Sequence, residues 1–201
     1  MTTGLSATTF EKLQLNAGIF LTGFDYSSAT DAATLKTKLA EYIKAGEGVL
    51  GATRGGGKFT CTPSTRNIEA DGKRYEFVGS TVNDGWTVSL STTLLESDAE
   101  TFKLALMSAD VTTSTDKLKN TIKIRTDIAT TDYLDKLCWV GDTSKGYVLI
   151  ELENALNISG ASFSFTDKGE GTLPVEFRAH QSSLESTEYA PCTVVFFNTA
   201  S

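Results

Sequence analysis

The stretch Trp86-Thr-Val-Ser-Leu-Ser91, "WTVSLS", alternates apolar and small polar side chains. Successive side chains of a β-strand point to opposite faces, so this period of two predicts a strand with one buried face and one wet face. The inward set is Trp86, Val88 and Leu90, and the outward set is Thr87, Ser89 and Ser91. The turn residues Asn83-Asp-Gly85 come just before and would begin the strand. The stretch therefore indicates an antiparallel sheet.

Similar strand signals recur along most of the chain, and the residue ranges are 16–24, 68–77, 121–126, 137–141, 147–153, 161–166, 173–180 and 193–197. Asp71-Gly72 is a two-residue hairpin signal, and Pro174 restricts its stretch to a sheet edge or a strand start. Phe163 and Phe165 would share one strand face, with Ser162 and Ser164 on the other.

Two helices are expected between these strands. Residues 31–45 carry Leu35, Leu39 and Ile43 on one face, with Thr30 or Asp31 as the cap. Ser97-Asp-Ala-Glu100 is a capping box that opens a second helix. With 201 residues, the expected fold is a single, mainly β domain, a β-sandwich or barrel with one or two flanking α-helices.

Two segments lack periodicity. Residues 1–16 are expected to be an N-terminal arm that becomes ordered only on contact, and the polar residues 111–120 to be a flexible loop. Neither segment can bury enough apolar surface on its own, so we expect both segments to become ordered only in an assembly.

The glycine-rich stretch 51–59, "GATRGGGKF", superficially resembles a phosphate-binding loop. That loop needs a glycine at position 52, where Ala52 stands, and a Ser or Thr after Lys58, where Phe59 stands. A helix should also follow, but the residues up to Pro63 alternate instead. Glycines also allow close approach of a backbone. Arg54, Gly55, Gly56 and Gly57 are therefore candidates for an assembly loop that approaches a neighbouring subunit or its own sheet.

The composition is that of a globular protein, with 40% hydrophobic and 21% charged residues and a net charge of -7. This acidity argues against a nonspecific grip on nucleic acid, which needs clustered Lys and Arg. No secretory signal opens the chain, and no apolar run is long enough to cross a bilayer. Cys61, Cys138 and Cys192 form no C-x-x-C pair, so neither a zinc site nor a disulfide framework is expected.

Nothing in the sequence assembles a catalytic set. His180 is the only histidine, and no G-x-S-x-G elbow accompanies it. Glu151 and Glu153 would share the wet face of a half-solvated strand, so we interpret the pair as a surface feature rather than a glycosidase dyad. The chain is not expected to be an enzyme, and no cofactor or metal is expected.

Several phrases occur in a specific order along nearly the whole chain: "NAGIFL" at 16–21, "GATRGGGKF" at 51–59, "WTVSLSTTLLE" at 86–96, "WVG" at 139–141 and "NALN…EGTLPVEF" at 154–177. Together they resemble the major tail proteins, or tail tube proteins, of long-tailed, siphovirus-type bacteriophages and prophages. The helix at 31–45 lies between two of these phrases and would be an elaboration of a subgroup.

The resemblance implies a structural virion protein of β-sandwich fold. Six copies would close into a ring, and stacked rings would form the tail tube through which genomic DNA is ejected. The implied partners are further copies of the chain, the tape measure protein, the tail terminator and distal tail proteins, and double-stranded DNA that passes without specific binding. No membrane partner is expected. The protein would be found in the virion, and in the host cytoplasm during assembly.

An acidic tube would repel DNA phosphates and let the duplex slide. The lumen-facing candidates are Thr87, Ser89, Ser91, Ser162, Ser164 and Glu176, with Arg178 on the same strand face as Glu176. Two other classes stay open. The first is a binding module, such as a phage capsid decoration protein or an adhesin, and the second is an enzyme.

Overall fold

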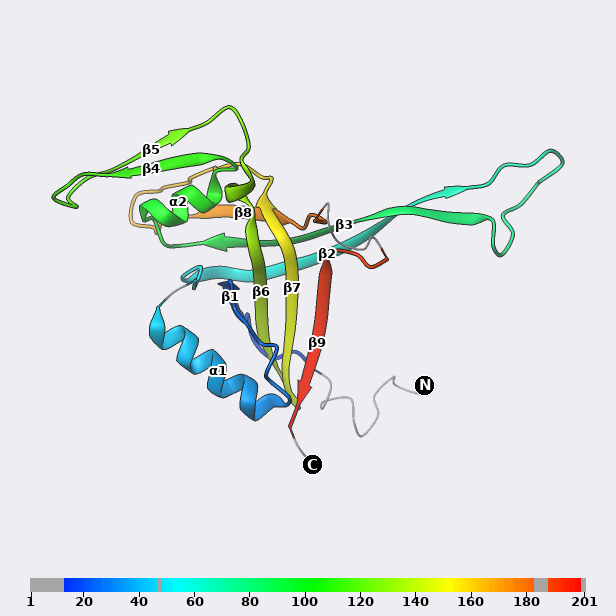
Figure 1. The fold of residues 1–201 in the computed structure, drawn as a ribbon, viewed down its shortest axis with the longest axis horizontal. Coiled ribbons are helices and arrows are strands. Elements are labelled where there is room, and N and C mark those ends of the chain that lie inside the picture. The colour runs from blue at the N-terminus through cyan, green and yellow to red at the C-terminus, as the bar shows by residue number, and fades with distance from the viewer. Residues whose placement is uncertain (1–12, 47, 183–187, 200–201) are drawn as a thin grey trace.

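The computed structural model describes residues 13–46, 48–182 and 188–199 (Figure 1). The expected fold class is confirmed, because strands dominate and two α-helices flank them. The strands are β1 (Ile19–Thr22), β2 (Thr53–Asn67), β3 (Thr81–Leu94), β4 (Ala109–Thr113), β5 (Asn120–Ile124), β6 (Leu134–Thr143), β7 (Gly146–Asn157), β8 (Leu173–Arg178) and β9 (Cys192–Asn198). The helices are α1 (Ala32–Ala45), α2 (Ala99–Ala105) and a 3-10 turn at Thr130–Asp132.

The strand β7 belongs to two groups of antiparallel strands. Its first part pairs with β6 on one side and β9 on the other, and β1 extends this group beyond β6. Its last residues, Leu156 and Asn157, pair instead with β8, which continues to β3 and β2. Between the two parts, Asn154 takes the left-handed backbone conformation with φ 44°. Figure 1 shows the result: β6, β7 and β9 run across β2, β3 and β8 as a second layer.

The main core lies between these two layers. Leu137 of β6 and Leu152 of β7 pack there against Val88, Leu90 and Phe177 from the other layer. All of these side chains are at most 2% exposed. The alternation that predicted Val88 and Leu90 as inward-facing is thus confirmed, and α2 closes one end of this core through Ala105.

A second core lies on the opposite face of β6 and β7, beneath α1. Leu35 of α1 packs there with Phe24, Val140 and Leu149. Because β6 and β7 are covered on both faces, their neighbouring apolar residues enter different cores. A continuous apolar run such as the one before Glu151 is typical of strands buried on both sides.

The helix α1 confirms the expected boundaries. The Asp31 carboxylate accepts a hydrogen bond from the Thr34 backbone N–H at 2.8 Å, and Gly46 ends the helix with φ 73°. The face that carries Leu35, Leu39 and Ile43 is buried most deeply near its beginning: Leu35 is fully buried, whereas Ile43, in the last turn, is 43% exposed.

The longest hairpin differs from the expectation. Residues 68–80 form the loop that joins β2 to β3, so the expected strand at 68–77 is wrong and Asp71-Gly72 turns within that loop. Asn83–Gly85 lies inside β3, beside a register shift, rather than in a turn. Pro63 does not end β2, because β2 is an edge strand and a proline there costs no sheet hydrogen bond.

Two further segments correct the sequence interpretation. The expected loop at 111–120 falls in the β4–β5 hairpin, with Val111 paired to Ile122 and only residues 114–119 outside the strands. Its threonine-rich polar composition concealed a hairpin that is exposed on most of its surface. The expected strand at 161–166 is absent, and a single bridge between Ser164 and Thr172 stands in its place. Residues 161–170 are all exposed, so no second sheet face orders them.

Candidate assembly surfaces

The most distinctive surface is a projection that we call the arm, residues 62–87. It comprises the outer parts of β2 and β3 and the connecting loop, and it extends far from the rest of the molecule (Figure 1). No residue of the arm is buried. Large apolar side chains nevertheless gather on it, and Val78 is fully exposed. The others are Ile68, Tyr75, Phe77 and Trp86.

Trp86 was expected in the core and instead is 47% exposed. It continues the inward face of β3, on the same side as Val88, but β8 pairs with β3 only from Ser89 onward. The sandwich therefore ends just before Trp86, and the apolar face of the strand continues into solvent. The sequence pattern identified the face correctly but not the point at which its cover stops.

The glycine-rich stretch forms an irregularity at the body end of β2. Thr53 pairs with Leu94 and Gly57 with Thr92, so the residues between them bulge from the ladder. Gly55 and Gly56 have φ values of 76° and 74°, a conformation that glycine adopts without strain. The Thr92 hydroxyl donates a hydrogen bond to the Gly56 carbonyl at 2.8 Å and holds the bulge in place.

The four assembly-loop candidates have different surroundings. A Cβ on Gly57 would lie 2.5 Å from Phe20 Cζ and 2.9 Å from the Ser91 carbonyl oxygen, so this glycine packs tightly on its own sheet. A Cβ on Gly55 would meet nothing within 4 Å. Arg54 is exposed and forms an ion pair with Glu170 at 3.3 Å. We expected this loop to approach either a neighbouring subunit or its own sheet, and contact with its own sheet explains why residue 57 is a glycine.

The polar faces of β2, β3 and β8 join into one surface. Ser91 is aligned with Lys58 and Glu176, and Ser89 with Thr60 and Arg178. The expected common face of Glu176 and Arg178 is confirmed by this register. Lys58 is an additional cation that the strand-by-strand interpretation missed.

The residues expected to face the lumen differ in their solvent exposure. Thr87 is exposed, and Ser91 and Glu176 are partly exposed. Ser89 is only 6% exposed, so its assignment to a wet face is wrong for the single chain, because it lies on a central strand flanked by larger side chains. Ser162 and Ser164 are exposed but lie outside the sheet.

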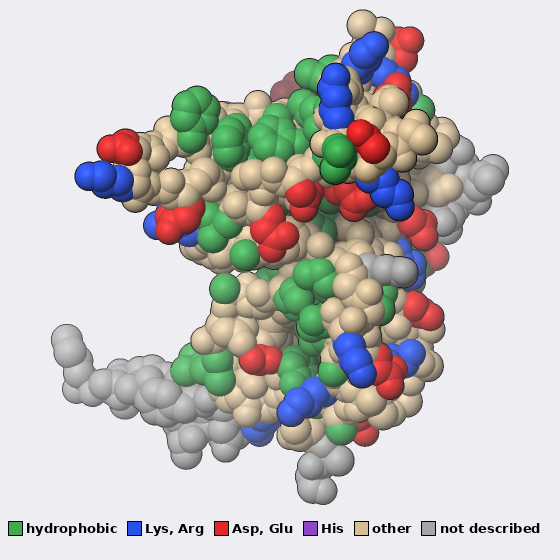
Figure 2. Space-filling view, turned by 90° about the vertical axis from the view of Figure 1, so that its left-hand side faces the viewer, with side chains coloured by type: hydrophobic (Ala, Val, Ile, Leu, Met, Phe, Trp, Pro, Cys, Tyr) green, Lys and Arg blue, Asp and Glu red, His purple; other side chains and the backbone are tan. Residues whose placement is uncertain are grey.

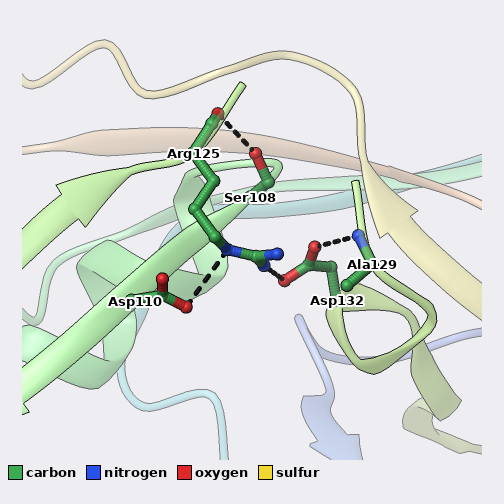
Figure 3. A network of polar contacts seen from close by, with 5 residues as sticks. All are labelled: Ser108, Asp110, Arg125, Ala129 and Asp132. Carbon is green, nitrogen blue, oxygen red and sulfur yellow. Dashed lines mark hydrogen bonds and ion pairs between the residues drawn. The ribbon is translucent and has the colours of Figure 1, made fainter. Parts of the chain in front are cut away.

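The β4–β5 hairpin is a second projection, and an ion-pair network ties its base to the body (Figure 3). The Arg125 guanidinium contacts Asp132, whose side chain is 5% exposed, and Asp110, at 3.1 Å. The second Asp132 oxygen accepts the Ala129 backbone N–H at 2.8 Å. The Ser108 hydroxyl donates to the Arg125 carbonyl at 3.0 Å. The hairpin is therefore fixed at its base, while its far end carries the exposed side chains of Leu118 and Lys119.

A cleft of about 520 Å³ lies between α2 and the segment that follows α1. Its floor includes Leu134, Ala155 and Phe177, and its rim includes Glu96 and Glu100. Figure 2 shows this side of the molecule, where acidic side chains lie among hydrophobic ones across the middle of the surface. Lys103 lines the cleft as well, so an apolar floor with a rim of both charges suits an apolar polypeptide segment that carries charged residues.

The buried carboxylate of Glu151 is a feature that the sequence interpretation missed. Glu151 was expected on a wet face, but it is 5% exposed in the second core, where Tyr26 and α1 cover that face. Lys136 approaches it at 3.5 Å and compensates the charge. Burial raises the pKa of the neighbouring Cys138 thiol to about 12, and the Glu151 charge adds to this rise. Burial followed by the same charge also raises the pKa of Tyr26 to about 12.

His180 has structural contacts. Its Nδ1 lies 3.2 Å from the Asn154 carbonyl oxygen, and Asn154 Nδ2 donates to the His180 carbonyl at 3.1 Å. The ring also meets Tyr133 edge-on at 5.2 Å. These contacts support the left-handed turn in β7 at Asn154.

Within the described ranges, no three His, Cys, Asp or Glu side chains come together as metal ligands. In the same part of the chain, no helix has the length and apolar character needed to span a bilayer. Most of the expected N-terminal arm lies outside the described residues. Its last part follows β6: the Leu15 N–H donates to the Asp142 carbonyl at 3.0 Å, and the Ser144 N–H to the Leu13 carbonyl at 3.0 Å.

Comparison with protein-family models gives no match, and no curated protein matches. Among solved structures, this chain is similar to one from a structure described as "Virion of native gene transfer agent (GTA) particle". The TM-score is 0.36 at 13% sequence identity, covering 65% of this chain and 82% of that chain.

Proposed function

We propose that this protein is a structural virion protein that polymerises through its arm, and that it builds the tail tube of a long-tailed phage as stacked hexameric rings. The ordered phrases described above, from residues 16–21 to 154–177, support the family. The tube would conduct genomic DNA, with the tape measure, tail terminator and distal tail proteins as its further partners.

The exposed arm is the observation that carries the self-assembly proposal. A two-stranded ribbon without a packed face is marginally stable in water, and contiguous exposed apolar side chains indicate an interaction site. Phe77 and Tyr75 are 61% and 77% exposed at the far end of this ribbon. A neighbouring copy that covered them would stabilise both the arm and the assembly.

The cleft beside α2 is our candidate acceptor for the arm of a neighbour. Its apolar floor matches the exposed Phe77 and Val78. The charges on its rim, Glu96, Glu100 and Lys103, could pair with Arg74 and Glu76 of the arm. The arm of one copy cannot reach its own cleft, because it points away from the body (Figure 1). Arm-to-cleft docking would therefore join different copies.

The polar face of β2, β3 and β8 supports the role as a DNA conduit. Its side chains are mostly short hydroxyls, and Lys58 and Arg178 share it with the carboxylate of Glu176. Such a face offers no row of cations to hold phosphates. The net charge of -7 per chain would make the assembled tube as a whole repel DNA, and this face adds only two separated cations with a carboxylate beside them.

The decisive experiment is to shorten the arm. Residues 68–80 would be replaced by Asn-Gly, a turn that closes a two-residue hairpin after the pair of Asn67 and Thr81. We expect the unaltered protein to form rings or tubes at high concentration, by sedimentation velocity and negative-stain microscopy. We expect the shortened protein to stay monomeric and folded.

A matched pair of point variants tests the docking surface. Phe77→Ser with Val78→Ser on the arm, and separately Glu100→Lys on the cleft rim, should each abolish tubes without changing the circular dichroism spectrum. Tubes that form normally from the shortened protein would rule out arm-mediated assembly. An unaltered protein that remains monomeric at high concentration would instead favour the binding-module alternative.

A further inference from the structure

Cys61 and Cys192 come from distant parts of the chain and meet at the rim of the main core. Cys61 lies in β2 opposite Val88 of β3, and Cys192 begins β9 opposite Leu152 of β7. Both partners, Val88 and Leu152, are buried in that core, and Cys192 packs against it. Figure 1 shows the first end of β9 beside β2. The pair therefore links the two layers at a point where no strand pairing joins them.

Burial first, and then the neighbouring Cys61 thiol, raise the pKa of Cys192, so the two side chains lie next to each other. Both are free thiols, with Cys61 exposed and Cys192 partly buried. The third cysteine, Cys138, is fully buried in the second core beneath α1 and lies beside Glu151. A soluble reagent can therefore reach the Cys61–Cys192 pair while Cys138 stays protected.

We propose that Cys61 and Cys192 are a redox pair, which a small-molecule disulfide such as oxidised glutathione converts into an intramolecular disulfide between β2 and β9. This inference does not depend on the proposed assembly. The three cysteines are free in the structure, as expected from their spacing, but their separation in the sequence hid the proximity of Cys61 and Cys192.

The exchange proceeds in two balanced steps. The exposed Cys61 thiolate attacks one sulfur of glutathione disulfide, which forms a mixed disulfide and releases one glutathione thiolate. The Cys192 thiolate then attacks Cys61 Sγ, closes the internal disulfide and releases the second glutathione. Two protein thiols are oxidised, one glutathione disulfide is reduced to two thiols, and the protons lost by the cysteines pass to solvent and glutathione.

The two steps should depend differently on pH. Burial raises the pKa of Cys192 to about 11, and the neighbouring Cys61 adds to this rise. The closing step therefore accelerates as the pH rises toward that value, because only the thiolate attacks. The mixed disulfide on Cys61 should be visible at neutral pH and should disappear faster under alkaline conditions.

The test is oxidation of the purified, full-length protein with glutathione disulfide, followed by alkylation under denaturing conditions and peptide mass spectrometry. We expect a Cys61–Cys192 cross-link, with Cys138 alkylated as the remaining thiol. The disulfide would close a loop of well over 100 residues, so we expect the melting temperature to rise by about 10 °C. A reductant should reverse the rise.

Three variants make the result specific. Cys192→Ser should retain glutathione on Cys61 and show no rise in melting temperature, whereas Cys61→Ser should react slowly and gain no cross-link. Cys138→Ala should still form the cross-link. A glutathione adduct on Cys61 of the unaltered protein that persists under alkaline conditions, or a cross-link between chains in place of the internal one, would overturn the proposal.

Discussion

The body and the arm are built from the same two strands but obey different constraints. In the body, Val88 and Leu90 of β3 are at most 2% exposed between two layers. Two residues before Val88 on the same strand, Trp86 is 47% exposed. Trp86 belongs to the arm, in which no residue is buried. Strand pairing thus continues where burial has stopped. The hydrogen-bonded ladder defines the arm, whereas packing defines the body.

The difference teaches what each region contributes. Burial of apolar surface supplies most folding stability, so the body should carry nearly all the stability of the free chain. The arm contributes exposed apolar surface that only another molecule can cover. Substitutions in the two regions should therefore separate folding from assembly.

The largest expected effect comes from a matched pair of phenylalanines. Phe177→Ala removes a side chain that is 2% exposed in the main core, and we expect a loss of about 3–5 kcal/mol in the free energy of unfolding. Phe77→Ala on the arm should change it by less than about 0.5 kcal/mol. Urea denaturation of dilute, monomeric protein measures both. Similar losses at the two positions would break the distinction between body and arm.

A second prediction concerns the base of the β4–β5 hairpin. Asp132→Ala leaves the Arg125 guanidinium and the Ala129 N–H without their buried partner, so we expect a loss of about 3 kcal/mol. Hydrogen exchange should also rise in β5. Asp110→Asn is the control, because this carboxylate is 65% exposed and its ion pair should contribute less than about 1 kcal/mol. An equal loss from both substitutions would show that the buried contact is not what anchors the hairpin.

Substitutions in the glycine bulge should reduce stability by a smaller amount, and they test whether packing on the body constrains this end of β2. Gly57→Ala places a Cβ against Phe20 and the Ser91 carbonyl, and we expect a loss of about 2 kcal/mol. Gly55→Asn meets open space and keeps a residue that tolerates positive φ, so the expected loss is below about 1 kcal/mol. Thermal unfolding compares the two. A larger loss at Gly55 would mean that backbone conformation, rather than packing on Phe20, dominates this site.

The last prediction concerns an effect on stability that is absent at neutral pH. The pKa of Cys138 is raised from 9.0 to about 12 by burial and then by Glu151, so the folded state holds this proton more tightly than the unfolded state. The resulting stability is fully present below pH 9 and is lost as the pH rises toward 12. Cys138→Ala should flatten this alkaline decline, as measured by urea denaturation across that range. An unchanged slope would place the alkaline sensitivity elsewhere, and Tyr26 is then the next group to replace with Phe.

Local patterns in the sequence predicted the elements better than their surroundings. The cap at Asp31, the end at Gly46 and the alternation at Val88 and Leu90 are short-range signals, and the structure confirms each. Tertiary cover is set by residues far away in the sequence. The exposure of Trp86 and the burial of Glu151 therefore could not be read from their own strands.

The assembly surfaces show the same limit. The glycine-rich stretch stood out in the sequence, but contact with Phe20, more than 30 residues away, explains Gly57. The arm was hidden because Asp71-Gly72 and Asn83–Gly85 both resemble hairpin turns. The true connection is the longer loop at residues 68–80, which contains the first of these signals, and the second lies inside β3. The proximity of Cys61 and Cys192 depends on the crossing of two layers, which no local spacing encodes.

The passage of β7 through both layers has a mechanical consequence. Tension applied along β7 would load its bonds to β6 and β9 together, in shear, so that many must fail at once. A pull that lifts β9 away from β7 would instead break their bonds one after another from an end. The molecule should therefore resist stretching along β7 far more strongly than peeling at β9, and a single-molecule pulling experiment along the two directions would measure the ratio of the two forces.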